Sequence, residues 1–436
     1  MLQYKGKYDD GIAATSAIFA GPQGLALDKD GNFYIATESK IRKITASTGI
    51  ITTVAGTRFS GSSGDGGQAS LALINGPSGL CLDISGNIFI ADSGNHRIRK
   101  ITLSTGVITT VAGNGQKGGS GGDNMAATNT TLDTPMDVAV DLSGNIFIAD
   151  YYNDRIRMVT AGTGIITTIA GCAFKINAAN IGITTAATEV YIRTPIGVTL
   201  DTSGNVYIAG GYLDNCIFKV TVSTGYMSIV AGQGQFGFLN DSSGYNGDNI
   251  LATKAKLFTP FKVAFDSSSN MFISDSRNYR VRKVTASTGM ITTIAGTGAR
   301  GLAAGDNEGG AATSTPIGMP YGIAVDALGN FYYTDSQFHV VSKVTYTEVS
   351  PSASVTSAPS VTRAPSSSVA STPTVSSSIS KAPVVTPSAS TSTSAAPATS
   401  STTGQQGSAA THVVEALHVT VILLISILIL HSCRDA

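Results

Sequence analysis

Short apolar runs, four to six residues long and bounded by Gly, Asn, Asp and Ser, recur along most of the chain. Each unit holds a run ending in Asp, a turn that is usually Gly-Asn, a run such as IFIAD, an alternating run such as RIRKIT, and a run close to ITTVAG. β-Branched and aromatic runs framed by turn formers are typical of strands joined by tight turns. The unit returns six times, near Pro22, Pro77, Pro135, Pro195, Pro260 and Pro320.

Four short antiparallel strands form a sheet that cannot cover both of its own faces. Stacking such sheets around an axis buries the faces against each other, which is the arrangement of a β-propeller. Six repeats therefore predict an all-β fold, a six-bladed propeller over residues 1–349.

The repeat also carries a family resemblance. The pattern Pro-x-Gly, Leu-Asp, Gly-Asn, Ile-Ala-Asp and Asn-x-Arg-Ile, clearest at residues 77–101 and 135–159, resembles the NHL repeat. The resemblance covers residues 22–346, roughly three quarters of the chain. It implies an NHL-type propeller but leaves activity open, because such propellers include protein binders, RNA binders and some enzymes.

The sixth repeat ends differently from the others. After its third strand, at residues 341–345, the chain continues without an ITT-AG element. Residues 10–15 align with residues 65–70, so the N-terminus begins at a stretch that elsewhere follows the fourth strand. We expect blade six to lack its outer strand unless residues 2–4 supply a stub. We also expect a longer transcript, with a signal peptide and an ITT-AG strand upstream.

Charge and composition narrow the function classes. With 28 Lys+Arg against 28 Asp+Glu, the chain has no net charge for binding nucleic acid by bulk electrostatics. The predicted propeller has two histidines, His96 and His339, in different blades, which do not make a His-based zinc site. We expect no catalytic residue, no metal and no cofactor. The alternative is an extracellular hydrolase or lyase with a metal in the channel, which requires three or more Asp, Glu or His side chains converging on its axis.

An Asp after the second strand and an Arg at the start of the third occur together in three repeats and are both missing from the fourth. We interpret these residues as intrablade ion pairs that fix the loop between the two strands. The expected pairs are Asp92 with Arg97, Asp150 with Arg155, and Asp275 with Arg280.

Linkers between blades carry a second motif, an Asp followed four and five residues later by Ala and Ser/Thr. Propeller topology places these linkers on the same face as the second-to-third strand loops, which makes that face the expected binding surface. The alternative is that the Asp residues only shape turns, since one carboxylate per loop is far from the ~6–8 oxygens of a calcium site. By the same argument, residues 28–32 are expected to form a hairpin turn and not a calcium loop. The candidate binding residues are Asp65, Asp123, Asp248, Asp306, His96, Tyr151, Tyr152, Arg277 and Tyr279.

Two further features concern loops. Cys172 and Cys216 fall in loops expected on one face, so a disulfide between them is one expectation, although four cysteines are too few for a disulfide scaffold. Asn129 and Asn240 begin N-glycosylation sequons in interblade loops.

Residues 350–411 are almost entirely Ser, Thr, Ala, Pro and Val and hold too little large apolar surface to form a core. They are expected to form an extended O-glycosylated stalk or, alternatively, a plain linker. Residues 412–436 contain a short apolar run, expected to be either a glycosylphosphatidylinositol (GPI) signal or a single-pass helix with a polar tail. The GPI attachment candidates are Gly407, Ser408 and Ala409.

These parts together predict a cell-surface propeller attached to the plasma membrane through its C-terminal segment. Its expected role is non-catalytic binding or adhesion, with a protein or glycan partner and no nucleic acid. The competing classes are the extracellular enzyme named above and an intracellular scaffold.

Overall fold

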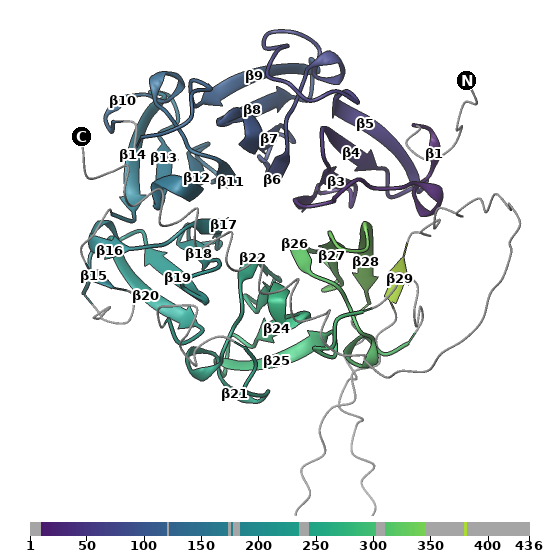
Figure 1. The fold of residues 1–436 in the computed structure, drawn as a ribbon, viewed down its shortest axis with the longest axis vertical. Helices are drawn as coiled ribbons and strands as arrows, with labels where there is room; N and C mark the ends of the chain where they lie inside the picture. Colours follow the sequence, from purple (N-terminus) through teal and green to yellow (C-terminus); the bar gives the residue numbers. More distant parts are fainter. Residues whose placement is uncertain are drawn as a thin grey trace, which may run out of the picture. The chain divides into compact units, whose positions relative to one another are not determined.

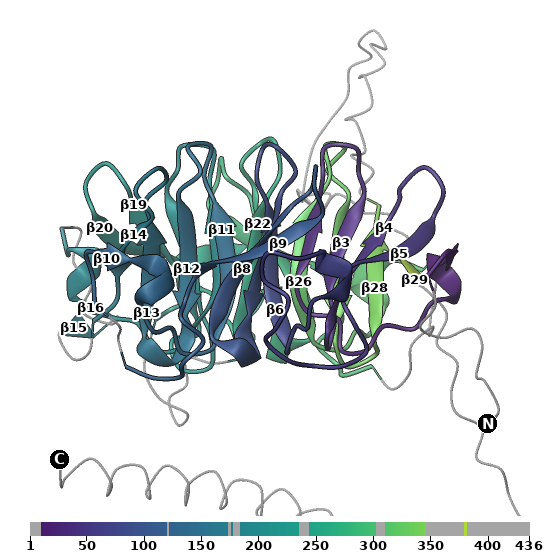
Figure 2. The ribbon, with the colours of Figure 1, turned by 90° about the horizontal axis from the view of Figure 1, so that it is seen from above.

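The computed structural model confirms an all-β propeller of six blades arranged around a central axis (Figure 1). It describes residues 10–119, 122–172, 176–177, 184–234, 244–301, 310–345 and 379–381. The chain divides into two units, Met1–Val385 and Thr386–Ala436, and every described residue belongs to the first. Viewed edge-on, the blades stand side by side with their connecting loops on two opposite faces (Figure 2).

Each blade is an antiparallel sheet whose strands follow chain order from the axis outward, and blades one, three and five gain a short fifth strand from the preceding linker. Blade one consists of β1 (Ile12–Ala13), β2 (Leu25–Leu27), β3 (Phe33–Ala36), β4 (Lys40–Ile44) and β5 (Ile50–Gly56). Blade two consists of β6 (Pro77–Leu82), β7 (Ile88–Asp92), β8 (Arg97–Thr102) and β9 (Val107–Ala112). Blade three consists of β10 (Met125–Ala126), β11 (Pro135–Val140), β12 (Ile146–Asp150), β13 (Arg155–Val159) and β14 (Ile165–Ala170).

The second half repeats this plan. Blade four consists of β17 (Pro195–Leu200), β18 (Val206–Gly210), β19 (Cys216–Thr221) and β20 (Tyr226–Ala231), and a parallel pair, β15 (Ile176–Asn177) and β16 (Val190–Tyr191), precedes it. Blade five consists of β21 (Ile250–Leu251), β22 (Pro260–Phe265), β23 (Met271–Asp275), β24 (Arg280–Val284) and β25 (Met290–Ala295). Blade six consists of β26 (Pro320–Val325), β27 (Phe331–Asp335), β28 (Val340–Val344) and β29 (Ile379–Lys381).

Single 3-10 turns lie in two kinds of loop. Those in the linkers are η1 (Ala14–Ser16), η2 (Ala69–Leu71), η4 (Ala127–Asn129), η7 (Ala187–Glu189), η8 (Ala252–Lys254) and η10 (Ala312–Ser314). Those between the second and third strands are η3 (Ser93–Asn95), η5 (Tyr151–Asn153) and η9 (Ser276–Asn278).

The hydrophobic core is divided into six clusters, each lying between two neighbouring blades. The cluster that closes the ring packs Leu25, Ile35 and Ile51 of blade one against Tyr332 of blade six. A blade thus buries each face only against a neighbour, as the sequence predicted.

Hydrogen bonds between adjacent blades reinforce this packing near the start of the inner strands of blades one, three, four and five. The backbone N–H of Thr134 in blade three donates to Nδ1 of His96 in blade two, at 3.1 Å. The N–H of Gly21 in blade one donates in the same way to Nδ1 of His339 in blade six, at 3.1 Å. Asp154 and Asn215 accept equivalent bonds from the blades that follow theirs. His96 is therefore a contact between blades, and the bond to His339 joins the last blade to the first.

Blade six differs from the expectation. Its outer position is occupied by β29, which pairs antiparallel with β28 and comes from within the segment predicted to be an extended stalk. Residues 2–4, the expected alternative source of this strand, lie outside the described residues. The short run Ile379–Lys381 lacks the ITT-AG pattern, so the sequence repeat did not reveal it.

Candidate binding surface at the channel mouth

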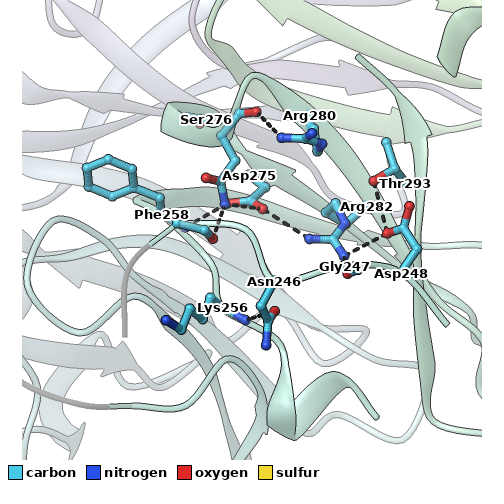
Figure 3. A network of polar contacts seen from close by, with 12 residues as sticks. Asn246, Gly247, Asp248, Lys256, Phe258, Asp275, Ser276, Arg280, Arg282 and Thr293 are labelled. Carbon is cyan, nitrogen blue, oxygen red and sulfur yellow. Dashed lines mark hydrogen bonds and ion pairs between the residues drawn. The ribbon is translucent and has the colours of Figure 1, made fainter. Parts of the chain in front are cut away.

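A buried arginine lies between two carboxylates in blade five (Figure 3). Nη2 of Arg282 donates to Oδ1 of Asp248 at 2.9 Å, and Nη1 lies 3.5 Å from Oδ2 of Asp275. Asp248 also accepts a bond from Oγ1 of Thr293, and Asp275 accepts one from the backbone N–H of Phe258. This network connects the linker with the second, third and outer strands of the blade.

The network recurs in blades two and three. In blade two, Arg99 lies 2.7 Å from the linker carboxylate of Asp65 and 3.7 Å from the second-strand carboxylate of Asp92. In blade three, Arg157 lies 2.8 Å from Asp123 and 3.5 Å from Asp150. Both guanidinium groups are fully buried. The linker carboxylates of Asp65, Asp123 and Asp248, predicted as binding candidates, are thus each engaged with an arginine of their own blade.

The structure corrects the expected arginine partners. Asp92, Asp150 and Asp275 stand opposite Arg97, Arg155 and Arg280 in the strand ladders, but their carboxylates approach the arginine two residues further on. Arg97 lies 3.9 Å from Asp65 instead. Arg155 and Arg280 donate to the backbone oxygens of Asn153 and Asn278. The reason is geometric: residues two apart on a strand share one face, and the more deeply buried arginine reaches both carboxylates.

Blade four replaces the ionic network with an apolar one. Phe218, fully buried, stands at the position that corresponds to Arg99. A Cβ atom on Gly210 would lie 2.8 Å from the Phe218 ring and 2.8 Å from Cβ of Asp214, so an aspartate does not fit there. In blades two, three and five the second-strand aspartate accepts a backbone N–H of the linker. Asp214 does so in blade four, where its Oδ2 accepts the backbone N–H of Arg193 at 2.8 Å.

Asp214 gives a pH-dependent prediction. Burial raises the pKa of Asp214 from 3.8 to about 7, so the folded state binds a proton that the unfolded state releases between these values. Its stabilising contribution is complete below pH 3.8 and is lost as the pH rises through about 7. We expect Asp214→Asn to flatten the pH dependence of the free energy of unfolding by up to about 1.4 kcal/mol per pH unit in this window. Parallel denaturant titrations of both proteins at pH 5, 6, 7 and 8 measure this, and identical pH profiles would contradict it.

The remaining loop predictions have separate outcomes. Cys172 and Cys216 are both free thiols, so the expected disulfide is absent, and Cys216 is buried within the core between blades three and four. Tyr279 packs against the cluster between blades five and six. Asn129 is exposed at the end of η4. Five predicted sites lie outside the described residues: Asp306, Asn240, Gly407, Ser408 and Ala409.

The inner strands converge on a narrow central channel. Its cavity volume is about 30 Å³, room for about one water molecule. The last position of the Pro-x-Gly pattern lines this channel and is Gly in four blades, but Asp137 in blade three and Lys262 in blade five. Nζ of Lys262 donates to Oδ2 of Asp137 and, at 2.9 Å, to the backbone oxygen of Val198. A charged pair thus bridges across blade four inside the channel.

Glycines make this bridge sterically possible. A Cβ atom on Gly79 would lie 2.6 Å from Cα of Asp137, and one on Gly197 would lie 2.3 Å from the backbone oxygen of Phe261. Burial raises the pKa of the Asp137 carboxyl, and the Lys262 ammonium opposes that effect. The first strands were predicted to be apolar runs, and this pair was not predicted, although the two departures from Gly could have revealed it.

Aromatic side chains line the mouth of the channel on the face that carries the loops between the second and third strands. The Phe261 ring centroid lies 4.0 Å from that of Tyr321 and 6.0 Å from that of Tyr212, so the cluster spans blades four, five and six. The Arg277 guanidinium lies over the Tyr212 ring, 5.0 Å from its centroid. We call Tyr212, Phe261, Tyr321 and Arg277 the mouth cluster.

Tyr151 extends the mouth cluster toward blade three. Burial raises its pKa to about 12, and the neighbouring Tyr152 and Tyr212 add to the effect. Tyr151 packs edge-on against Tyr152, with ring centroids 4.6 Å apart, and Tyr152 is 59% exposed. The predicted residues Tyr151, Tyr152 and Arg277 therefore lie on one face of the mouth. Tyr212, Phe261 and Tyr321 were not predicted, because they occupy positions that vary between repeats.

Few carboxylate or imidazole groups gather at this surface in the described part of the chain. Within the described residues, no group of three or more His, Cys, Asp or Glu side chains is placed to hold a metal ion. The channel itself carries one carboxylate, Asp137, among its described lining residues. The mouth instead offers aromatic faces, tyrosine hydroxyls and an exposed arginine, groups that suit recognition of a partner surface.

Family models match two segments of the chain. Residues 4–63 match the teneurin NHL domain, and residues 75–101 match the NHL repeat. These matches support the NHL-repeat character of the propeller.

Curated relatives share parts of this chain. It is 25% identical over 283 residues to the chloroplastic protein SUPPRESSOR OF QUENCHING 1 of Arabidopsis thaliana, covering 63% of this chain and 26% of that protein. It is 27% identical over 237 residues to mouse teneurin-1, covering 51% and 8% respectively. It is 23% identical over 368 residues to chicken NHL repeat-containing protein 2, covering 77% and 47%. The chain therefore spans less than half the length of each of these relatives.

Solved structures support the fold. An auxiliary nutrient binding protein from Bacteroides thetaiotaomicron superposes with a TM-score of 0.53 at 18% identity, covering 78% of this chain and 72% of that one. A protein of unknown function from the same organism gives a TM-score of 0.55 at 17% identity with the same coverage. At this level of identity the likeness concerns architecture alone.

Proposed function

We propose that this protein is a non-catalytic binding or adhesion module that presents the mouth cluster to a protein or glycan partner. The observation that carries the proposal is the joined set of tyrosines, phenylalanine and arginine at the channel mouth. Tyrosine and arginine dominate the energetics of recognition surfaces, because they combine large contact area with directional polar groups. The channel behind the mouth has room for little more than water, so the partner binds across the mouth.

The names of similar proteins support a binding role. One structural neighbour is a nutrient-binding protein, and the teneurin NHL domain is the model that matches the N-terminal repeat. We further propose that the module acts at the cell surface, held there by the C-terminal segment at residues 412–436 beyond the Ser/Thr/Pro-rich stalk. Among the described residues, no helix has the length and apolar character needed to cross a bilayer, and residues 412–436 lie outside them.

Surface labelling of intact cells that express the full chain tests the placement. We expect a membrane-impermeant reagent to label the protein, and treatment with a phosphatidylinositol-specific phospholipase to release it if the anchor is a lipid. Retention after this treatment indicates a single-pass helix. Protein that is labelled only after the cells are opened would contradict the cell-surface proposal.

Binding of the purified, fluorescently labelled full chain to intact cells tests the activity. Pretreating the cells with a protease removes a protein partner, whereas pretreating them with glycosidases removes a glycan partner. We expect one pretreatment to abolish saturable binding. Absence of saturable binding on every cell type that expresses the protein or contacts such cells would contradict the binding role.

A further inference from the structure

Blade one departs from the arginine network of its siblings. Arg42 occupies the position of Arg99 and pairs with the linker carboxylate of Asp10 at 3.0 Å. The second carboxylate position, held by Asp92 in blade two, is Thr37, whose hydroxyl donates to the backbone oxygen of Lys40 at 3.0 Å. Blade one thus carries a threonine at the position where blades two, three and five place the second carboxylate.

The adjoining loop is also shorter in blade one. Two residues separate Thr37 from Lys40, whereas four separate Asp92 from Arg97. In blade two the longer loop supplies Asn95, whose side chain covers the Asp92 carboxylate with a 2.8 Å hydrogen bond. Blade one has no counterpart of this side chain between residues 37 and 40.

A cavity of about 220 Å³ lies at this place. Three cationic side chains, Lys40, Arg42 and Arg58, contribute to its lining, together with Thr37 and one carboxylate, Glu38. Arg42 is 3% exposed, so its charge acts from within the protein, whereas Arg58 and Glu38 are exposed at the rim. The lining charges sum to +2, from three cations and one anion, and the ion pair with Asp10 offsets the charge of Arg42.

We propose that this cavity binds the carboxylate group of a small acidic ligand. The ligand carboxylate lies in the cavity beside Thr37, at the position where blades two, three and five carry their own aspartate. Lys40 and Arg58 complete the charge complementarity, and the planar guanidinium suits a carboxylate. The site lies in blade one, apart from the mouth cluster of blades four to six, so its test is independent of the proposed function.

The carboxylate can come from an acidic amino acid or from an acidic sugar. Titration of the full-length protein with N-acetylaspartate and with glucuronate, followed by calorimetry or by NMR, distinguishes these sources. Their neutral counterparts, N-acetylasparagine and glucose, are the matched controls. We expect a dissociation constant of about 1 mM for one of the two acids and at least tenfold weaker binding of its neutral counterpart.

Thr37→Asp is the decisive variant, because it restores the aspartate found in the sibling blades. We expect it to keep the fold and to weaken carboxylate binding at least tenfold. The double variant Lys40→Gln/Arg58→Gln changes only side chains at the half-buried and exposed edge of the cavity and should weaken binding similarly, which keeps the test valid if Thr37→Asp fails to fold. The proposal is overturned if neither acid binds, if neutral analogues bind equally well, or if the folded variants bind like the wild type.

Discussion

Replacing Arg282 by methionine should lower the free energy of unfolding by about 3–5 kcal/mol, because the change leaves buried charge without its partner. Burial raises the pKa of Asp275 to about 6, and Arg282 opposes that effect, so at pH 8 the carboxylate is ionised and depends on the guanidinium. Asp248 loses the same partner. Denaturant titration at pH 8 measures the change.

Two further variants separate charge from packing at this site. Arg300→Met makes the same substitution at an exposed linker position and should change stability by no more than about 0.5 kcal/mol. Adding Asp275→Asn to Arg282→Met removes the unpaired carboxylate and should recover about 1 kcal/mol or more. An Arg282→Met protein as stable as Arg300→Met would show that the buried network contributes nothing to the fold.

Replacing Gly322 by alanine should destabilise the ring by about 3 kcal/mol, since a Cβ atom there has no space. It would lie 2.4 Å from the backbone oxygen of Gln23 and 2.8 Å from the backbone nitrogen of Leu25. Both atoms belong to the chain leading into and forming the inner strand of blade one, so no side-chain rotation relieves the clash. Because this contact joins blade six to blade one, the substitution acts on ring closure, and thermal unfolding of the purified protein reports it.

Gly67→Ala provides the matched control for this steric argument. Gly67 is exposed in a linker, its φ is not in the left-handed region, and its nearest neighbour would be an ordinary contact at 3.4 Å. The same substitution there should be neutral or stabilise by about 0.5 kcal/mol, through the unfolded state. Equal stability of the two variants would show that the inner strands do not approach as closely as the structure indicates.

Sequence periodicity was sufficient to predict the blades, because each strand and turn is specified locally by short apolar runs and turn residues. The arginine partners were harder to predict, since Arg97 and Arg99 lie on one face of the same strand. The two side chains differ in burial, and the fully buried Arg99 lies closer to Asp65. Loop composition singled out Tyr151, Tyr152 and Arg277, whose role in binding stays a prediction.

Pairings that depend on ring geometry were harder to predict, because the local pattern marks unusual residues without showing which of them meet. Asp137 and Lys262 are 125 positions apart and meet only because blades three and five both face the channel. Phe261 and Tyr321 stand 60 positions apart at equivalent sites of consecutive repeats, where neighbouring blades bring them together. These contacts can be inferred only once the repeats are placed around a closed ring.

The central claim is that partners bind at the channel mouth, and a single comparison of cell binding tests it most directly. The full-length protein with Tyr152→Ser and Arg277→Ser is compared with the wild type and with an Ile84→Ser/Leu142→Ser control. The control changes two residues that are 81% and 82% exposed, in the turns between the first and second strands, at the opposite end of the blades. The account predicts at least tenfold weaker binding for the mouth variant and unchanged binding for the control. Undiminished binding by a folded mouth variant, or loss of binding only in the control, would contradict it.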